Sequence, residues 1–505
     1  MATYHVENFG CRATQADGAA LERQFEARGL NRAAATHADL VILNSCTVTA
    51  SADQDARAAI RRVQRQNPLA KIIVTGCYAQ RAPEEIAALP GVTAVIGNSH
   101  KHQLAEIVLQ DPDRRDLGDR KGLRDREGHD FSRAAKILPT RPALAAEVDS
   151  ETVSPTFVSL NALTKNREPK TGSGVFVSDI FAHTELLAAP VFESVNSNSA
   201  ETSRTRPNLK VQDGCDNRCS FCVIPSVRGH SRSLHLSQVI SEVNALVESG
   251  YHEVVISGIN LGRWGRDLSL GDEAPDFVSL LRSILQETKL EKLRISSVEP
   301  MDWTRDLIDL VALSARIAKH AHVPLQSGSD AVLRRMHRKY RPWHYREKIE
   351  QIRAAMPTAA IGADVMVGFP GETDAEFEAT RRLIEDLPFT YLHVFTYSAR
   401  PGTPAATMSH QVPVHIARAR NKTLRDLATE KKFAFMNSFI GKPLEAITLN
   451  VTHNRGREEF TEALTDNYLK LYIRGAHKPN RWITAPITGV EVDTLMSSSC
   501  RTGPR

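Results

Sequence analysis

Apolar and amphipathic stretches alternate along the first part of the chain. Three short apolar runs predict strands, at residues 4–10, 39–46 and 70–77. Between them, polar stretches with helical spacing predict helices at residues 17–28 and 52–66. Apolar strands separated by amphipathic helices are typical of a parallel sheet covered by helices. We therefore predict an N-terminal domain with a parallel α/β sheet over residues 1–110.

The same alternation returns over residues 206–436. Apolar runs predict strands there, at residues 253–258, 292–300, 360–373 and 390–398. Between these strands, apolar residues at helical spacing predict helices at residues 236–249, 277–288 and 302–315. About six strand–helix units can be traced, where a closed barrel has about eight. The pattern therefore predicts a barrel-type α/β domain, a partial (β/α)6 barrel, with its chemistry at the carboxyl ends of the strands.

The remaining two parts of the chain have different patterns. Residues 111–205 begin with dense mixed charge and continue rich in Ser, Thr, Asn and Pro, which predicts a flexible connector. A basic arm that touches RNA is the alternative. Within this stretch, residues 175–192 carry enough apolar side chains to dock on a neighbour. Residues 437–505 show short alternating runs between turn residues, which predicts a small β-barrel.

Size and composition narrow the class of protein. A chain of 505 residues is too long for one core, so several domains are expected. No apolar run approaches the roughly 18 residues of a membrane span, and the first residues lack the pattern of a secretion signal. We therefore expect a cytoplasmic protein without membrane contact. The net charge of +5 permits nucleic-acid binding but does not argue for it.

Three cysteines stand close together in a loop rich in Gly, Asp and Asn, spaced C-x3-C-x2-C: Cys215, Cys219 and Cys222. Thiolates are soft ligands that favour iron–sulfur clusters or zinc, and a cubane cluster usually takes four of them. Because no fourth cysteine follows nearby, a cubane held here leaves one iron open to a substrate or cofactor. The alternatives are a zinc site completed by His230 or His235, and three buried structural cysteines.

A second set of cysteines is spread over the N-terminal domain. Each lies at the carboxyl end of a predicted strand, in the segments FGC, NSC and TGC: Cys11, Cys46 and Cys77. Ligands of open α/β sheets gather at the carboxyl ends of the strands, so these three side chains are expected to converge. Three unrelated buried cysteines are the alternative. A second three-cysteine cluster with one open iron explains the shared position better.

The Cys215–Cys222 loop resembles that of the radical S-adenosylmethionine (SAM) superfamily. In that superfamily the open iron chelates SAM, and the aromatic residue at the place of Phe221 lies near the adenine. Two sets of three cysteines in this order resemble the methylthiotransferases, radical SAM enzymes with an auxiliary [4Fe-4S] cluster in the N-terminal domain. Four segments resemble the branch of this family that acts on N6-threonylcarbamoyladenosine in tRNA, namely GCRATQADG, NSCTVTASAD, RRVQRQNP and GCYAQRAPEE. The first segment departs from that branch at Thr14, where Asn is expected.

The resemblance implies a tRNA-modifying enzyme with two [4Fe-4S] clusters and SAM. The expected reaction places a methylthio group on C2 of N6-threonylcarbamoyladenosine at position 37, in tRNAs reading ANN codons. The expected partners are the tRNA anticodon stem-loop and an electron donor such as flavodoxin or ferredoxin, with the sulfur source unknown. The C-terminal part resembles a TRAM domain, a small RNA-binding barrel. Alternatives are methylthiolation of N6-isopentenyladenosine in tRNA or of a ribosomal-protein aspartate, or a non-catalytic iron–sulfur protein that binds RNA.

The resemblance also assigns candidate ligand-binding residues. Phe221 and polar or glycine residues at the ends of the central strands are expected to line the SAM pocket, namely Gly258, Asn260, Glu299, Gln326, Ser327 and Gly368. The basic, aromatic stretch 334–346 and one turn of the C-terminal part supply candidate RNA contacts, namely Arg338, Lys339, Tyr340, Arg341, Asn467 and Tyr468. For residues 334–346, a solvated face with core aromatics is the alternative.

Overall fold

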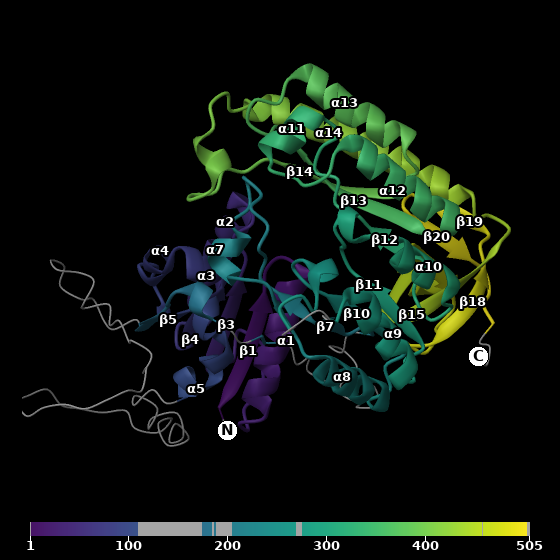
Figure 1. Cartoon of the computed structure of the whole chain (residues 1–505). Coiled ribbons are helices and arrows are strands. Elements are labelled where there is room, and N and C mark those ends of the chain that lie inside the picture. Colours follow the sequence, from purple (N-terminus) through teal and green to yellow (C-terminus); the bar gives the residue numbers. More distant parts are fainter. Residues whose placement is uncertain are drawn as a thin grey trace, which may run out of the picture.

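A computed structural model describes residues 2–109, 174–183, 186–187, 205–268, 275–456 and 458–501. These residues form an N-terminal sheet, a central set of parallel strands with helices, and a C-terminal sheet (Figure 1). Most of the predicted connector, residues 111–205, lies outside the described residues. Among the helices that the structure describes, none combines the length and apolar content needed to cross a membrane.

The N-terminal part is a six-stranded sheet in the order β2-β1-β3-β4-β5-β6, and every pairing in it is parallel. Its central strand β3 is buried at every position, with apolar clusters on both faces, as expected when helices cover both sides. The parallel α/β sheet predicted from the sequence is therefore confirmed. Its strands are β1 (Thr3–Asn8), β2 (Asn31–Arg32), β3 (Leu40–Ser45), β4 (Lys71–Gly76), β5 (Val92–Gly97) and β6 (Gly174–Phe176), and its helices are α1 (Arg12–Glu26), α2 (Ala50–Gln66), α3 (Cys77–Arg81), α4 (Pro83–Ala87) and α5 (Leu104–Leu109).

Two details of this sheet bear on the sequence predictions. The docking expected of residues 175–192 is confirmed at its start, because β6 pairs with β5 and Ile180 is buried. The helix predicted to begin at residue 17 begins at Arg12 instead. Its first turn carries no apolar periodicity, yet Ala13 and Thr14 are buried there, so tertiary packing adds the extra turn.

The central part holds two three-stranded parallel sheets, β7-β10-β11 and β12-β13-β14. Parallel bridges from Leu293 to Ile317 and from Ser297 to His322 connect the two sheets. The strands form an arc whose outer side carries helices (Figure 1). The strands are β7 (Asn208–Lys210), β10 (Glu253–Ser257), β11 (Lys292–Ile295), β12 (His320–His322), β13 (Ala360–Val367) and β14 (Tyr391–Thr396).

Each of the three helices predicted in the central part forms, and the third is shorter than predicted. The helix predicted over residues 302–315 begins at Arg305, because Thr304 caps it by accepting the backbone N–H of Leu307. The helices are α7 (Ile224–Arg228), α8 (Leu236–Glu248), α9 (Phe277–Glu287), α10 (Arg305–Leu313), α11 (Asp330–Arg335), α12 (Pro342–Ala355), α13 (Asp374–Asp386) and α14 (Val414–Asn437), and a short antiparallel pair is formed by β8 (Gln212–Asp213) and β9 (Arg232–Ser233).

The C-terminal part is a curled six-stranded sheet in the order β18-β15-β16-β17-β20-β19. A register shift between Thr448 and Thr452 bends its longest strand, and the sheet encloses its own apolar core. The buried Lys292 and Arg294 of β11 hold it to the centre, with Lys292 Nζ 3.0 Å from Asp466 Oδ1. Its strands are β15 (Pro443–Arg455), β16 (Glu458–Thr465), β17 (Lys470–Arg474), β18 (Trp482–Pro486), β19 (Gly489–Glu491) and β20 (Thr494–Ser497).

Candidate functional site

The three N-terminal cysteines follow three neighbouring strands. Cys11 caps α1 after β1, Cys46 follows β3, and Cys77 begins α3 after β4. Because β1, β3 and β4 are adjacent in the sheet and parallel, their carboxyl ends lie at one edge. The fold therefore brings together three cysteines that lie far apart in sequence.

The backbone around these cysteines is closely packed. Gly10 has a φ of +99°, and a Cβ there would lie 2.8 Å from the sulfur of Cys46, so this loop requires glycine. Cys46 and Cys77 are buried while Cys11 is exposed. Burial raises the pKa of the Cys46 thiol to about 12, and the neighbouring Cys77 and Cys11 add to this effect. A thiolate at Cys46 therefore needs a nearby positive charge, which a bound metal supplies.

The other three cysteines stand in the loop between β8 and α7. Cys215 donates its backbone N–H to Gly229 O at 3.1 Å, and Cys222 donates to Cys219 O at 3.1 Å. These bonds fold the loop back on itself and hold the three side chains in one short segment. Burial raises the pKa of the Cys222 thiol to about 12, so a thiolate there also needs a nearby positive charge.

Polar side chains from the central strands approach the sulfurs of this loop. The Asn260 Nδ2 atom lies 3.8 Å from Cys215 Sγ, and Arg338 Nη1 donates to Cys219 Sγ at 3.2 Å. Arg338 also pairs with Glu299, whose pKa is raised by burial although Arg338 opposes this shift. Such donors orient thiolate ligands and stabilise their negative charge.

The zinc alternative for either triad finds no support in the geometry. A tetrahedral zinc ion bound by thiolates about 2.3 Å away needs ligand atoms within roughly 3.8 Å of one another. Among the described residues, no group of three or more ligand atoms within 4.8 Å contains a cysteine. His230, one proposed fourth ligand, is exposed and pairs with Asp216 at 2.8 Å instead.

Several residues predicted to bind SAM surround the Cys215–Cys222 loop. Asn260 is buried, its N–H bonds to Gln212 Oε1 at 2.7 Å, and its Oδ1 has no hydrogen-bond partner. A Cβ on Gly258 would lie 2.8 Å from the same Gln212 oxygen, so a side chain there would collide with it. Phe221 packs edge-on against Phe369, with ring centroids 6.5 Å apart.

Three other predicted SAM residues have structural partners of their own. Gln326 adopts a positive φ of 63°, and its N–H bonds to Asp364 O at 2.8 Å. Ser327 is fully buried and bonds the Thr380 hydroxyl at 3.1 Å. A Cβ on Gly368 would lie 2.6 Å from Ala417 Cβ, so this glycine allows α14 to pack closely. These two bonds and the close packing at Gly368 fix the loops that surround the site.

Burial corrects the expected RNA contacts at Arg338 and Tyr340. Arg338 is buried against Cys219 and Glu299, and Tyr340 is 1% exposed, with its hydroxyl donating to Leu325 O at 2.7 Å. Because neither side chain is exposed to a phosphate or a base, Tyr340 is a core aromatic, as the alternative interpretation held, whereas Arg338 is buried and not part of a solvated face. Lys339 remains exposed, and Arg341 is partly exposed with an ion pair to Asp330 at 3.1 Å.

The two candidates in the C-terminal turn also face inward. Asn467 is buried and donates to Thr358 O at 3.0 Å, which contradicts an RNA contact for its side chain. Tyr468 has a positive φ of 66° and stacks near His320, with ring centroids 4.5 Å apart. Its hydroxyl accepts a bond of 3.2 Å from Arg12, the residue after Cys11. Tyr468 therefore joins all three folded parts.

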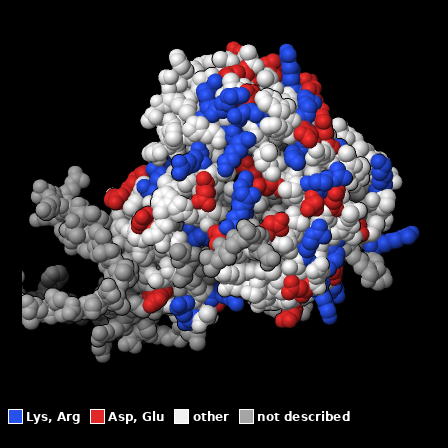
Figure 2. Space-filling model, viewed as in Figure 1, with Lys and Arg blue, Asp and Glu red and all other residues white. Residues whose placement is uncertain are grey.

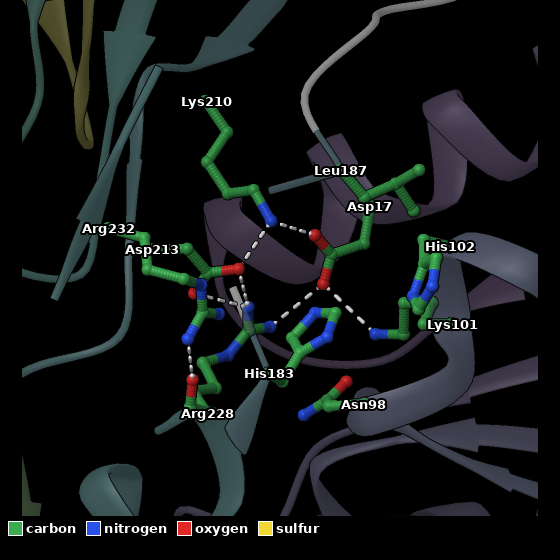
Figure 3. A pocket seen from close by; sticks show the side chains of 10 residues that line it. All are labelled: Asp17, Asn98, Lys101, His102, His183, Leu187, Lys210, Asp213, Arg228 and Arg232. Carbon is green, nitrogen blue, oxygen red and sulfur yellow. Dashed lines mark hydrogen bonds and ion pairs between the residues drawn. The ribbon is translucent and has the colours of Figure 1, made fainter. Parts of the chain in front are cut away.

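A buried network of five charged side chains joins the N-terminal sheet to the central strands (Figure 3). Asp17 pairs with Lys101 at 3.0 Å and with Arg228 at 2.9 Å, and it also pairs with Lys210. Asp213 pairs with Lys210 at 2.6 Å and with Arg228 at 2.9 Å. Burial alone would raise the pKa of Asp17, but the Lys101, Lys210 and Arg228 cations outweigh it and lower the pKa to about 2.

This network holds the two cysteine sites in a fixed relation. Asn98 donates to Val227 O of α7 at 2.7 Å and lies 3.6 Å from Cys77 Sγ, so it touches both sides. A second link between the N-terminal and central parts lies just after Cys46. There, Thr47 and Asp53 both bond Arg400, which follows β14 in the chain. The sequence carried no signal for these contacts, since their partners are far apart along the chain.

Two stretches of the chain match known protein families. Residues 3–97 match the family described as "Uncharacterized protein family UPF0004", and residues 209–384 match the radical SAM superfamily. The solved structure of the radical SAM methyltransferase TsrM from Kitasatospora setae is 16% identical, with a TM-score of 0.49, and covers 80% of this chain and 74% of that one.

Curated relatives match most of the chain. It is 33% identical over 479 residues to the threonylcarbamoyladenosine tRNA methylthiotransferase MtaB of Bacillus subtilis, covering 94% of this chain and 91% of that protein. The protein of the same name from Aquifex aeolicus is 31% identical, with 93% and 96% covered. The tRNA-2-methylthio-N(6)-dimethylallyladenosine synthase of Novosphingobium aromaticivorans is 32% identical, with 88% and 86% covered.

Proposed function

This chain belongs to the radical SAM tRNA methylthiotransferase family, and we propose that it methylthiolates C2 of N6-threonylcarbamoyladenosine at position 37 of tRNA. The observation that carries the proposal is the presence of two cysteine triads in one chain, one in a loop and one at the edge of a parallel sheet, in parts that the Arg228–Asp17 ion pair joins. The B. subtilis and A. aeolicus relatives named for this substrate support it.

The residues fit a [4Fe-4S] cluster at each triad and SAM beside one of them. Each triad supplies three soft ligands, and buried thiols with a raised pKa, such as Cys46 and Cys222, become thiolates only with a cation at hand. The unpartnered Asn260 Oδ1 beside Cys215 is suited to accept a hydrogen bond from SAM. When bound, the clusters and SAM supply the radical and sulfur chemistry that no side chain can perform.

The protein's own side chains orient these groups and bind the substrate. Arg338 holds Cys219 and Glu299 in place, and Gln212 fixes the backbone at Asn260. Lys and Arg side chains run down the middle of the face in Figure 2, between the N-terminal sheet and the central strands of Figure 1. Exposed Lys339 and Trp343 suit phosphate contact and base stacking. We assign the tRNA anticodon stem-loop to this face.

The finer fold assignments follow from the same membership. We propose that the six central parallel strands form a partial (β/α)6 barrel and that the curled C-terminal sheet is TRAM-like. The domains are then residues 1–110, 111–205, 206–436 and 437–505. An electron donor such as flavodoxin or ferredoxin would reduce the cluster at the Cys215–Cys222 loop.

The test separates the roles of the triads. A chain with Cys11→Ala, Cys46→Ala and Cys77→Ala, reconstituted anaerobically, is expected to convert SAM to 5′-deoxyadenosine but to form no 2-methylthio product. Both products are measured on one folded sample with tRNA that contains threonylcarbamoyladenosine. Full methylthiolation by this variant would overturn the proposal. If the three cysteines held a structural zinc ion instead, the variant would melt at a lower temperature than the parent, because structural zinc contributes folding energy.

A second candidate substrate, N6-dimethylallyladenosine, is favoured by the relative from N. aromaticivorans. Nucleoside mass spectrometry of tRNA from a deletion strain separates the two, because only the true substrate accumulates without its methylthio group. Accumulation of dimethylallyladenosine alone would favour this second candidate. A non-catalytic RNA-binding protein would leave both nucleosides unchanged and yield no 5′-deoxyadenosine.

A further inference from the structure

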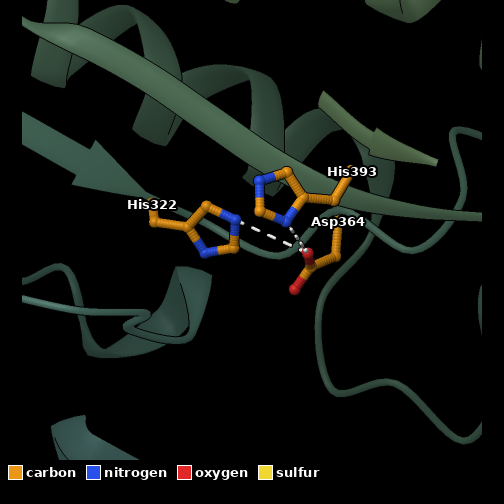
Figure 4. A group of neighbouring side chains, drawn as sticks. All are labelled: His322, Asp364 and His393. Atoms are coloured by element: carbon orange, nitrogen blue, oxygen red, sulfur yellow. Dashed lines mark ion pairs between the residues drawn. The ribbon is translucent and has the colours of Figure 1, made fainter. Parts of the chain in front are cut away.

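Three potential metal ligands lie side by side on consecutive parallel strands of the central part. His322 ends β12, Asp364 lies on β13 and His393 on β14 (Figure 4). The His322 Nε2 atom is 3.5 Å from Asp364 Oδ1, and His393 Nδ1 is 3.7 Å from the same oxygen. The three ligand atoms all lie within 4.8 Å of one another.

The buried His322 ring has one nitrogen bonded and one without a hydrogen-bond partner. Its Nδ1 is 2.5 Å from Ser297 Oγ, whereas its buried Nε2 forms no hydrogen bond and faces Asp364. His322 is 7% exposed, so water does not satisfy that atom from bulk solvent. A histidine whose second nitrogen is held by a neighbour is the usual form of a metal ligand, because the bond fixes the ring and its tautomer.

We propose that His322, Asp364 and His393 bind one divalent first-row transition ion of the Zn²⁺ type. A tetrahedral ion with ligands about 2.1 Å away needs edges of roughly 3.4 Å between ligand atoms, close to the two histidine–carboxylate distances. Two imidazoles and one carboxylate suit zinc, cobalt or ferrous iron. The site uses none of the six cysteines of the two triads.

The proposed site is also accessible. The His393 side chain is 52% exposed and that of Asp364 27%, so three protein ligands leave a coordination position open to solvent. Tyr391 and His320 pack beside it, with ring centroids 5.9 Å apart, and Tyr391 lies 5.5 Å from the His393 ring. The competing interpretation is a wall of stacked polar rings that binds no metal.

The test measures Zn²⁺ binding to the reconstituted holoenzyme, in which both clusters occupy the cysteines. Calorimetric titration and elemental analysis after gel filtration are expected to give one zinc per chain in addition to iron. Asp364→Asn and His393→Gln are expected to weaken zinc binding at least about 100-fold, and Ser297→Ala about 10-fold to 100-fold. His453→Gln is the matched control, since His453 forms a surface pair with Glu462 at 3.0 Å and should leave binding unchanged.

Two results overturn the proposal: no zinc taken up by the parent protein, or equal uptake by the parent and His393→Gln. His393 is half-exposed, so its variant is expected to fold even if Asp364→Asn does not, and its circular dichroism melt verifies this. Loss of methylthiolation with unchanged zinc uptake would identify a wall of the substrate site instead. These measurements test the metal site alone and not the proposed reaction, because zinc binding is measured without any activity assay.

Discussion

Cys215, Cys219 and Cys222 stand in one loop between β8 and α7, whereas Cys11, Cys46 and Cys77 follow three separate strands. The first triad lies within one short stretch of the chain, which backbone bonds from Cys215 to Gly229 and from Cys222 to Cys219 hold in shape. The second exists only when β1, β3 and β4 are paired. The spacing of the loop triad is therefore set by one short segment, with contacts such as that of Arg338 added from elsewhere in the central part, whereas the sheet triad depends on the whole N-terminal fold and on what fixes it to the centre.

The largest effect is expected from removing the loop triad. With Cys215→Ala, Cys219→Ala and Cys222→Ala, SAM cleavage should fall to background, because the cluster that reduces SAM has no ligands. Iron should fall from about eight atoms per chain to about four, since the sheet triad keeps its own cubane. Iron analysis and 5′-deoxyadenosine yield measure both quantities. Iron retained in full would mean that these cysteines hold no cluster.

The sheet triad should be more sensitive to a change in the buried network. Asp17→Asn removes the carboxylate that pairs with Lys101 and leaves Lys210 and Arg228 with Asp213 alone, and it should lower the free energy of unfolding by about 3–5 kcal/mol. Iron at the sheet triad should be lost before iron at the loop triad. The control is Asp386→Asn, an exposed partner of Arg346, which should cost at most about 1 kcal/mol. Equal losses from the two variants would contradict the role given to the network.

A smaller effect is expected at the loop triad from Arg338→Gln. This change removes the donor to Cys219 Sγ and leaves Glu299 without its cation, and it should weaken SAM binding about 10-fold to 100-fold. The iron content should not change, because the three cysteines remain. Arg334→Gln, at an exposed position of the same stretch, is the control. Weaker tRNA binding with normal SAM affinity would restore the RNA role that burial argues against.

The smallest effect is a dependence of stability on pH. The pKa of Asp17 is lowered to about 2, so its stabilising contribution is complete above the pKa of an unfolded aspartate, about 3.9, and is lost as pH falls toward 2. The difference in unfolding free energy between parent and Asp17→Asn should be constant from pH 7 to pH 5. It should then shrink by about 2 kcal/mol on further acidification. Denaturant titrations at several pH values measure it, and a constant difference down to pH 2 would exclude the ion pairs as its cause.

The sequence alone predicted the features that come from a repeated strand–helix pattern or from a short segment of the chain. The apolar segments that end in Cys11, Cys46 and Cys77 predicted the strands of the parallel sheet. The spacing of Cys215, Cys219 and Cys222 predicted the cysteine loop of the central part. Exposure could not be read from residue type, which is why Arg338 and Tyr340 were assigned to RNA although both are buried. Contacts across the chain, such as Asp17 with Arg228, depend on tertiary packing and leave no local pattern.

The five-charge network limits which related genes can recombine to give a folded protein. Asp17 and Lys101 come from one part of the gene, and Lys210, Asp213 and Arg228 from another. A recombination between those parts would join halves from two parents, and a neutral residue at any of the five positions would bury an unmatched charge. The halves of this protein are therefore exchangeable only between parents whose interface charges agree.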